Sequence, residues 1–192
     1  MEQYESFESD KKICMHFEDD RERFEGAVVP PIFHNTLFTY PTFDILADAL
    51  QSEHSFYVYG RGTNPTVEIV EKKIAALERG EACKCFSSGM AAVSASIINS
   101  VKSGEHVLCV SNLYYSTIEL LKYLGKFNIS HSVIYSTKIE EIKEAIQPNT
   151  KLIYLESPTD LTFRVVNLDE LAKLAKTLGI RTVIDNTWAT PI

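Results

Sequence analysis

From residue 66 onward, short apolar segments alternate with segments of helical periodicity, and this alternation constrains the fold more than any other feature. The apolar segments are ACKCF (82–86), HVLCV (106–110), SHSVIYS (130–136), KLIYLES (151–157) and RTVIDN (181–186). The segments with helical spacing are 66–81, 88–104, 117–127, 139–146 and 168–179. This order predicts an α/β domain with a mostly parallel sheet and helices on both faces. Continuous apolar strands also indicate that both faces are covered.

Residues 1–57 lack this alternation. The stretch GAVVPPIFHNTLFTYPTF (26–43) contains three prolines and many β-branched and aromatic residues, and FDILADALQSE (43–53) allows a short helix at most. Such a segment has little core of its own, so we expect an extended arm that lies on another surface. The predicted organisation is an arm over 1–57 followed by an α/β domain over 58–192.

Composition and charge exclude several partner classes. The chain has 192 residues, 45% of them hydrophobic, and a formal net charge of −7. An acidic chain with scattered basic residues has no footprint for nucleic acid. No apolar run is long enough to span a bilayer, and the acidic start MEQYESFESDKK is unlike a signal peptide. The sequence therefore predicts a cytoplasmic protein without a membrane partner.

The cysteines do not predict a metal site. Cys83 and Cys85 form C-x-C, and no pair of histidines at metal spacing accompanies them. Residues two apart on a strand share a face, so we interpret both as core or near-core thiols rather than metal or redox groups.

The candidate chemistry lies where the predicted strands end. Ligands of open α/β sheets bind beyond the carboxyl ends of the strands. The segment SSGM follows the strand at 82–86 and begins a helix. Free N–H groups at a helix start bind phosphate, and the hydroxyl of Ser88 with the small Gly89 suits that role. The alternative is an ordinary helix cap at Ser87 or Ser88, with Gly89 incidental.

Two further strand ends carry candidate site residues. Asp185 follows the apolar run TVI, where a carboxylate is costly unless it is paired. It can hold a protonated pyridine nitrogen with support from Thr187, or it can cap a helix or form a salt bridge. Tyr114 follows the strand at 106–110 and can stack on a flat cofactor or move protons. The alternative is that Tyr114 or Tyr115 packs between helix and sheet.

The loop YGRGTNPT (59–66) precedes the first predicted helix. Asn64 and Pro65 have the types expected at the cap and first position of that helix. Capping does not explain Tyr59 and Arg61, and an arginine can pair with a phosphate through two hydrogen bonds.

Four motifs in order, YGRGTNPT, FSSGMAA, LYYST and VIDNTWATP, resemble the Cys/Met-metabolism family of pyridoxal-phosphate-dependent enzymes. That family includes cystathionine γ-lyase, cystathionine γ-synthase, methionine γ-lyase and O-acylhomoserine sulfhydrylases. The resemblance runs from about residue 28 to the last residue. It implies the large domain of the fold type I aminotransferase architecture, incomplete here, and pyridoxal 5′-phosphate as cofactor.

The resemblance also implies roles for individual residues. Gly89 and Met90 would bind the phosphate through backbone N–H groups, with Ser88 beside them. Tyr114 would stack on the pyridine ring and act in proton transfer. Asp185 would pair with the pyridinium nitrogen, with Thr187 in support. Tyr59 and Arg61 would reach the phosphate in a neighbouring subunit, which implies a homo-oligomer, in this family usually a tetramer.

The chain departs from the family pattern in three places. The family usually has E-x-P-x-N-P after the fourth strand, and its Asn hydrogen-bonds the 3′-oxygen of the cofactor. This chain has ESPTDL, so Asp160 takes that place, and the resemblance implies that a carboxylate there would favour a protonated 3′-oxygen or a shifted pKa of the internal aldimine. Tyr115 stands where Gly is common, and Ser116 stands where methionine γ-lyases carry Cys, which argues against a dedicated methionine γ-lyase.

The cofactor-binding lysine of this family follows the Asp motif, and no lysine of this chain lies beyond the last strand. We therefore expect the N-terminal portion of a lyase or transferase of transsulfuration and related amino-acid metabolism, inactive by itself. Its substrates would be of the cystathionine, methionine or O-acylhomoserine type. The alternative is a non-catalytic module that binds the cofactor or a phosphate. A nucleotide-binding α/β protein is disfavoured, because G-x-G-x-x-G and P-loop motifs are absent from the sequence.

Overall fold

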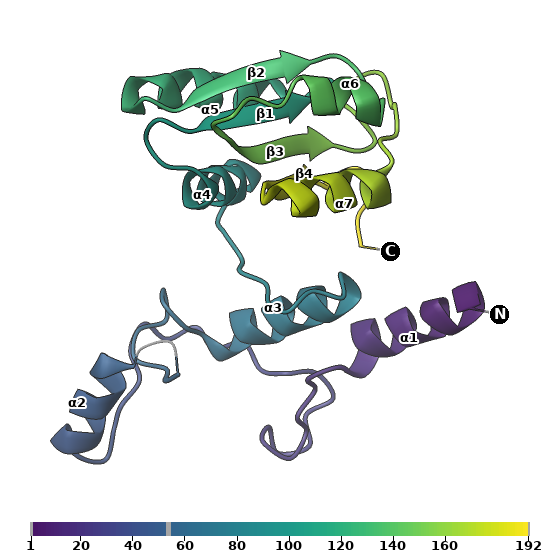
Figure 1. The fold of residues 1–192 in the computed structure, drawn as a ribbon. Helices are drawn as coiled ribbons and strands as arrows, with labels where there is room; N and C mark the ends of the chain where they lie inside the picture. The colour runs from purple at the N-terminus through teal and green to yellow at the C-terminus, as the bar shows by residue number, and fades with distance from the viewer. Residues whose placement is uncertain (1, 53–54, 192) are drawn as a thin grey trace. The chain divides into compact units, whose positions relative to one another are not determined.

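The computed structural model describes residues 2–52 and 55–191 (Figure 1). The chain divides into two compact units, one that runs up to Cys85 and includes Pro191, and one over Phe86–Thr190. Helix α3 (Pro65–Leu77), which the sequence places at the start of the α/β domain, lies in the first unit.

The second unit contains a four-stranded sheet in which every pairing is parallel. Its strands are β1 (His106–Val110), β2 (Ser130–Ile134), β3 (Thr150–Glu156) and β4 (Arg181–Asp185). Their order across the sheet is β2-β1-β3-β4. The helices are α4 (Gly89–Ser100), α5 (Tyr115–Leu124), α6 (Ile139–Glu144) and α7 (Leu168–Leu178), and the 3₁₀ turn η1 (Gly125–Phe127) follows α5. The parallel α/β class predicted from the alternation is confirmed.

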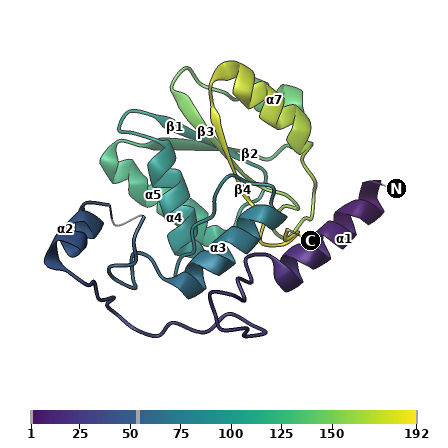
Figure 2. The same cartoon turned by 90° about the horizontal axis from the view of Figure 1, so that it is seen from below.

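Two apolar clusters sandwich the sheet. Successive strand residues point to opposite faces, so Val107 and Cys109 join one cluster and Leu108 and Val110 join the other. Helices α4 and α5 cover the first face, and α7 lies on the other (Figure 2). Helix α6 contributes Ile142 to the second cluster. Burial raises the pKa of the Cys109 thiol to about 12, which fits a structural thiol.

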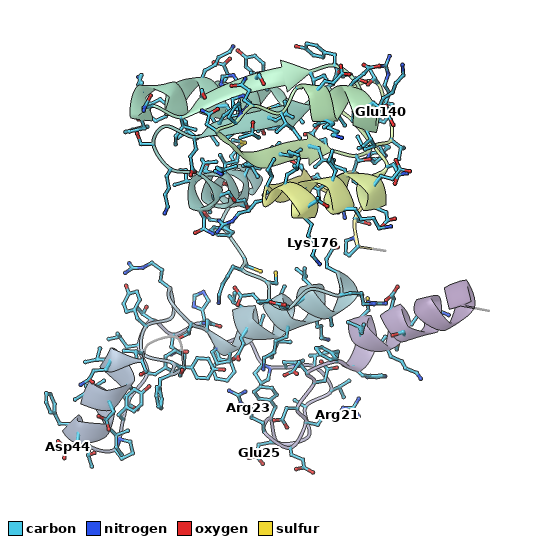
Figure 3. All side chains as sticks on the ribbon, in the orientation of Figure 1. Arg21, Arg23, Glu25, Asp44, Glu140 and Lys176 are labelled. Atoms are coloured by element: carbon cyan, nitrogen blue, oxygen red, sulfur yellow. The ribbon has the colours of Figure 1, made fainter. Side chains whose placement is uncertain are left out.

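The helices turn charged side chains outward from these clusters. Glu140 on α6 and Lys176 on α7 are both exposed (Figure 3). Helix α7 begins where the Asn167 side chain accepts the Glu170 N–H, and it ends at Gly179, which has a φ of 65°. A left-handed residue after a helix is favourable for glycine, so sequence and geometry agree at this end.

A buried histidine closes the amino end of the sheet. His106 is 1% exposed, its Nδ1 lies 2.8 Å from Thr150 Oγ1, and its Nε2 lies 3.0 Å from Ser132 Oγ. The Thr150 hydroxyl also accepts the Gln147 N–H, so its own hydrogen is available to Nδ1. Burial, with a smaller effect of nearby His131, lowers the pKa of His106 and favours the neutral ring.

Charged and polar side chains make several contacts within the first unit. It contains α1 (Glu2–His16), α2 (Phe43–Gln51) and α3. Arg79 pairs with Asp10 at 2.6 Å, and Lys73 pairs with Asp19 at 3.0 Å. Arg23, labelled in Figure 3, lies 3.4 Å from the Tyr57 hydroxyl, which in turn donates to Glu68.

One expectation for this unit is wrong, and one is confirmed. Residues 2–16 form a helix rather than an extended arm. They are rich in good helix formers but carry no apolar stripe, so the periodicity does not reveal the helix. The predicted cap is confirmed, because the Asn64 side chain accepts the Thr66 N–H and Pro65 is the first helical residue.

The segment 82–86 is not a strand, contrary to the sequence expectation. A strand exists only beside a hydrogen-bonded neighbour, and none of the four described strands pairs with this segment. Cys85 is exposed and Cys83 is half-buried, so the two thiols do not share a core face. Instead, both oxygens of Glu71 hold the segment, through the Cys85 N–H and the Lys84 ammonium.

Within the described residues, no helix has the length and apolar character needed to cross a membrane.

Candidate cofactor-binding site

A cavity of about 760 Å³ opens at the carboxyl end of the sheet, beyond β3 and β4 and beside the start of α4. This is where ligands of open α/β sheets bind. Seven of the nine site residues predicted from the sequence line it: Ser88, Gly89, Met90, Tyr114, Asp160, Asp185 and Thr187.

The start of α4 offers backbone donors to this cavity. Ser88 is the N-cap, and its Oγ accepts the Ala91 N–H at 3.1 Å, so the capping interpretation is confirmed. Gly89 and Met90 supply the first two N–H groups of the helix, which have no partner within it. A Cβ added at Gly89 would meet no atom within 4 Å. Packing within the chain therefore does not demand a glycine here.

Asp185 ends β4 with both carboxylate oxygens engaged. Its Oδ1 accepts the Thr187 N–H at 3.0 Å and the Thr187 hydroxyl at 2.5 Å. The Tyr154 hydroxyl approaches Oδ2 at 3.5 Å. Within the described part of the chain, Asp185 neither starts a helix nor pairs with a cation. Its carboxylate is oriented by neutral donors and retains its charge for another partner.

Tyr154 is a site residue that the sequence reasoning missed. It lies on β3, is 1% exposed, and lines the cavity beneath Asp185. Burial and the negative charge of Asp185 raise the pKa of Tyr154, so its hydroxyl remains a neutral donor. Its only signal in the sequence is a hydroxyl within the apolar run KLIYLE.

Tyr114 stands at the N-cap of α5 and lines the cavity, with 50% of its surface exposed. Tyr115 is 69% exposed. The alternative in which one of these rings packs between helix and sheet is wrong, because both residues are exposed, whereas the preceding Leu113 is buried in the core cluster. The Tyr114 ring is therefore accessible for stacking.

Glu156 is the second missed residue. It ends β3, lines the cavity and is 8% exposed, and its Oε1 accepts the Tyr114 N–H at 2.9 Å. Burial raises the pKa of Glu156, the charges of Asp185 and Asp160 raise it further, and the Tyr114 N–H opposes the shift. Its signal in the sequence is a carboxylate directly after an apolar strand, the same signal that identified Asp185.

The loop after β3 presents Asp160 to the cavity. Thr159 braces this loop, because its N–H donates to the Arg164 carbonyl and its Oγ1 accepts the Arg164 N–H, both at 2.9 Å. Phe163 and Trp188 form an aromatic pair on the cavity wall, with ring centres 5.1 Å apart. Sequence patterns give no signal for this pair, because the two rings come from separate loops.

Tyr59 and Arg61 lie in the first unit. The Arg61 guanidinium carbon lies 4.7 Å from the centre of the Tyr59 ring. This cation–π contact pairs the two residues with each other. Their predicted role at a neighbouring subunit's cofactor stays a prediction.

The residues present fit a phosphorylated, protonated pyridine ring. Donors for an anion stand at the α4 start, an oriented carboxylate stands at the β4 end, and an accessible aromatic ring lies between them in the chain, all on one cavity. Together with the parallel sheet, these features define an α/β protein built to bind a phosphorylated cofactor.

Comparison with known proteins identifies the family. The family model for Cys/Met metabolism PLP-dependent enzymes matches residues 11–192, and the chain belongs to this family. It is 35% identical over 168 residues to the L-methionine gamma-lyase of Fusobacterium nucleatum subsp. nucleatum, covering 86% of this chain and 42% of that enzyme. It is 34% identical to the cystathionine gamma-lyase of Bacillus subtilis, covering 94% of this chain and 46% of that enzyme.

A solved structure agrees with this assignment. The crystal structure of MetB from Corynebacterium glutamicum superposes with a TM-score of 0.85 at 29% identity, covering 95% of this chain and 46% of that chain. The partial fold type I domain expected from the sequence is confirmed. The chain spans less than half the length of each of these three proteins.

Proposed function

We propose that this chain is the N-terminal, cofactor-binding portion of a pyridoxal-phosphate-dependent lyase or transferase of sulfur amino-acid metabolism. Its reaction would be elimination or replacement at the β or γ carbon of cystathionine, methionine or O-acylhomoserine-type substrates. The observation that carries the proposal is the convergence of the α4 start, Tyr114 and Asp185 on one cavity.

Each cavity residue has a definite task in this proposal. The N–H groups of Gly89 and Met90, with Ser88, hold the phosphate. Asp185, oriented by Thr187 and Tyr154, holds a proton on the pyridine nitrogen. Tyr114 covers the ring face and carries protons. When bound, pyridoxal phosphate supplies an electron sink that stabilises carbanions next to the substrate nitrogen.

Cavity charge supports a role for Tyr59 and Arg61. The cavity lining includes the carboxylates of Glu156, Asp160 and Asp185, and no Lys or Arg among the described residues. Such a cavity suits a pyridinium ring but leaves a phosphate dianion without a counter-charge. Arg61 of a second subunit would provide it, if residues 1–57 of that second subunit lie on the surface of the subunit that carries the cavity. The active form would then be a homo-oligomer, as a tetramer in keeping with the family resemblance, and we place it in the cytoplasm.

The alternative function is a module that binds the cofactor without chemistry, because no lysine of this chain follows Asp185. In an enzyme of this kind a lysine anchors the aldehyde and acts as base for the α-proton. The coding sequence after Ile192 discriminates. A Ser/Thr-rich stretch with a lysine supports the enzyme, and an immediate stop supports the module.

A turnover assay tests the proposal on the chain itself. Purified chain is incubated with pyridoxal phosphate, reduced with borohydride and mapped by mass spectrometry, and release of thiol or 2-oxo acid from cystathionine is followed in parallel. We expect cofactor binding without turnover and without a single labelled lysine. Turnover with one specific lysine labelled would show that the chemistry resides in these 192 residues, and absence of binding would contradict the proposed function.

A further inference from the structure

Glu156 is a buried carboxylate whose described hydrogen bond goes to a backbone group far away in the chain. It accepts the N–H of Tyr114, 42 positions earlier, at 2.9 Å. A carboxylate at 8% exposure is unfavourable unless the groups around it compensate. The charges of its near neighbours Asp185 and Asp160 add repulsion, and backbone hydrogen bonding from Tyr114 and Asp160 opposes it. A residue that only filled space at the end of β3 would not need this charge.

The contact fixes a residue that has little else to hold it. Tyr114 precedes the first turn of α5 with a φ of −52° and a ψ of 129°, and its side chain makes no capping bond. Half of its surface is exposed, and within the described residues its hydroxyl has no hydrogen-bond partner. The described hydrogen bond that anchors Tyr114 to the end of β3 is therefore at its backbone N–H, where Glu156 binds.

We infer that Glu156 is the positioning residue for Tyr114, holding the start of α5 to the end of β3 so that the tyrosine ring faces the cavity. The inference rests on the proposed function only for what the ring does there, because the hydrogen bond itself belongs to the chain without ligand. The two carboxylates therefore differ in role. Asp185 is available to a ligand in the cavity, whereas Glu156 accepts a backbone hydrogen bond from Tyr114.

Amide hydrogen exchange of Tyr114, followed by NMR on the 192-residue chain, tests the contact. In Glu156→Ala the Tyr114 amide should exchange at least about tenfold faster, the loss expected for one hydrogen bond to a charged acceptor. Glu156→Gln should restore protection, because its amide oxygen also accepts. Glu156→Asp keeps the charge but shortens the reach, so it should lose protection, and it serves where the alanine variant does not fold. Asp185→Asn is the matched control and should leave the Tyr114 amide unchanged.

A double-mutant cycle tests the consequence for the cofactor. Pyridoxamine 5′-phosphate is the probe, because it has no aldehyde to react with surface lysines. Glu156→Ala should weaken its binding, and the same change in a Tyr114→Ala background should have no further effect. Additive losses would overturn the positioning role, as would unchanged Tyr114 exchange in both Glu156→Ala and Glu156→Asp. If the unaltered chain does not bind the probe, the proposed function fails while the exchange experiment still decides on Glu156.

Discussion

Buried ionisable groups at the two ends of the sheet differ in the partners that surround them. At the amino end, burial lowers the pKa of His106, and a hydroxyl lies at hydrogen-bond distance from each ring nitrogen. At the carboxyl end, Glu156 and Asp185 share a cavity with Asp160, and no cation lines that cavity among the described residues. The histidine at the amino end has its hydrogen-bond partners within the chain. The carboxylates at the carboxyl end lack a cationic partner among the described residues of the cavity lining, and a bound ligand would supply one.

This contrast separates stability from function. Buried polar groups with partners stabilise and specify a fold, whereas groups left uncompensated at one edge mark a site whose ligand completes it. A change at the amino end should therefore weaken the fold, and a charge-removing change at the carboxyl end should weaken binding while sparing the fold.

The largest expected effect is on binding at the carboxyl end. Asp185→Asn retains the bonds from Thr187 but cannot hold a proton on the pyridine nitrogen. We expect roughly a ten- to hundredfold loss of affinity for pyridoxamine 5′-phosphate, the range for a hydrogen bond to a charged group. Equilibrium dialysis measures the affinity, and urea unfolding should show no loss of stability. If Asp185→Asn binds the probe normally but unfolds more readily, the carboxyl end serves stability rather than binding, which contradicts the account.

Next in size is a loss of stability at the amino end. Thr150→Val keeps the shape but leaves His106 Nδ1 and the Gln147 N–H without a partner. We expect the free energy of unfolding to fall by about 1–3 kcal/mol. Urea titration measures this, with Thr177→Val as the exposed control, since Thr177 bonds only to a carbonyl of its own helix. If Thr150→Val and Thr177→Val are equally stable, the hydrogen bonds around His106 do not contribute to the stability of the fold.

The pH dependence of stability should have opposite signs at the two ends. The pKa of His106 is lower in the folded chain than its ordinary 6.5, so the unfolded chain takes up the proton first and stability falls as pH drops below about 6.5. The pKa of Glu156 is raised above its ordinary 4.5, so the folded chain holds this proton more tightly than the unfolded chain. The contribution of Glu156 therefore favours folding at low pH and is lost as the pH rises from about 4.5.

Two variants separate these slopes. His106→Gln should reduce the loss of unfolding free energy on acidification from pH 7 to 5, apart from the share of His131, whose pKa burial also lowers. Glu156→Gln should reduce the loss on going from pH 4.5 upward. Unfolding curves at several pH values give the slope of unfolding free energy against pH. His106→Gln should make this slope less positive, and Glu156→Gln should make it less negative. A slope change of the same sign in both variants would contradict the account.

The smallest effect is expected at Asp160. It lies on the loop after β3, where its charge adds to those of Glu156 and Asp185. Asp160→Asn should stabilise the ligand-free chain by less than about 1 kcal/mol and shift the absorption of bound pyridoxamine 5′-phosphate, because an amide no longer favours a protonated 3′-oxygen. If the absorption spectrum and its pH dependence are unchanged, Asp160 does not influence the protonation of the 3′-oxygen.

The sequence predicted the parts of the fold that follow local pattern. Strands β1–β4 were found because their apolar runs reflect burial on two faces. Asp185 was singled out because it follows such a run, and Ser88 because it begins a helix. Residues 82–86 failed as a strand because pairing requires a neighbour, which pattern cannot supply. Tyr154 and Glu156 were missed because their contacts, to Asp185 and Tyr114, join residues 31 and 42 positions apart.

One measurement tests the central claim that the carboxyl-end cavity binds the phosphorylated cofactor. Trp188 is the only tryptophan of the chain and lines that cavity, so its fluorescence reports directly on binding. Titration with pyridoxamine 5′-phosphate should quench Trp188 saturably, and pyridoxamine, which lacks the phosphate, should not do so at the same concentrations. Absence of saturable quenching, or equal quenching by both compounds, would contradict the assignment of the cavity and of the α4 start as its phosphate end.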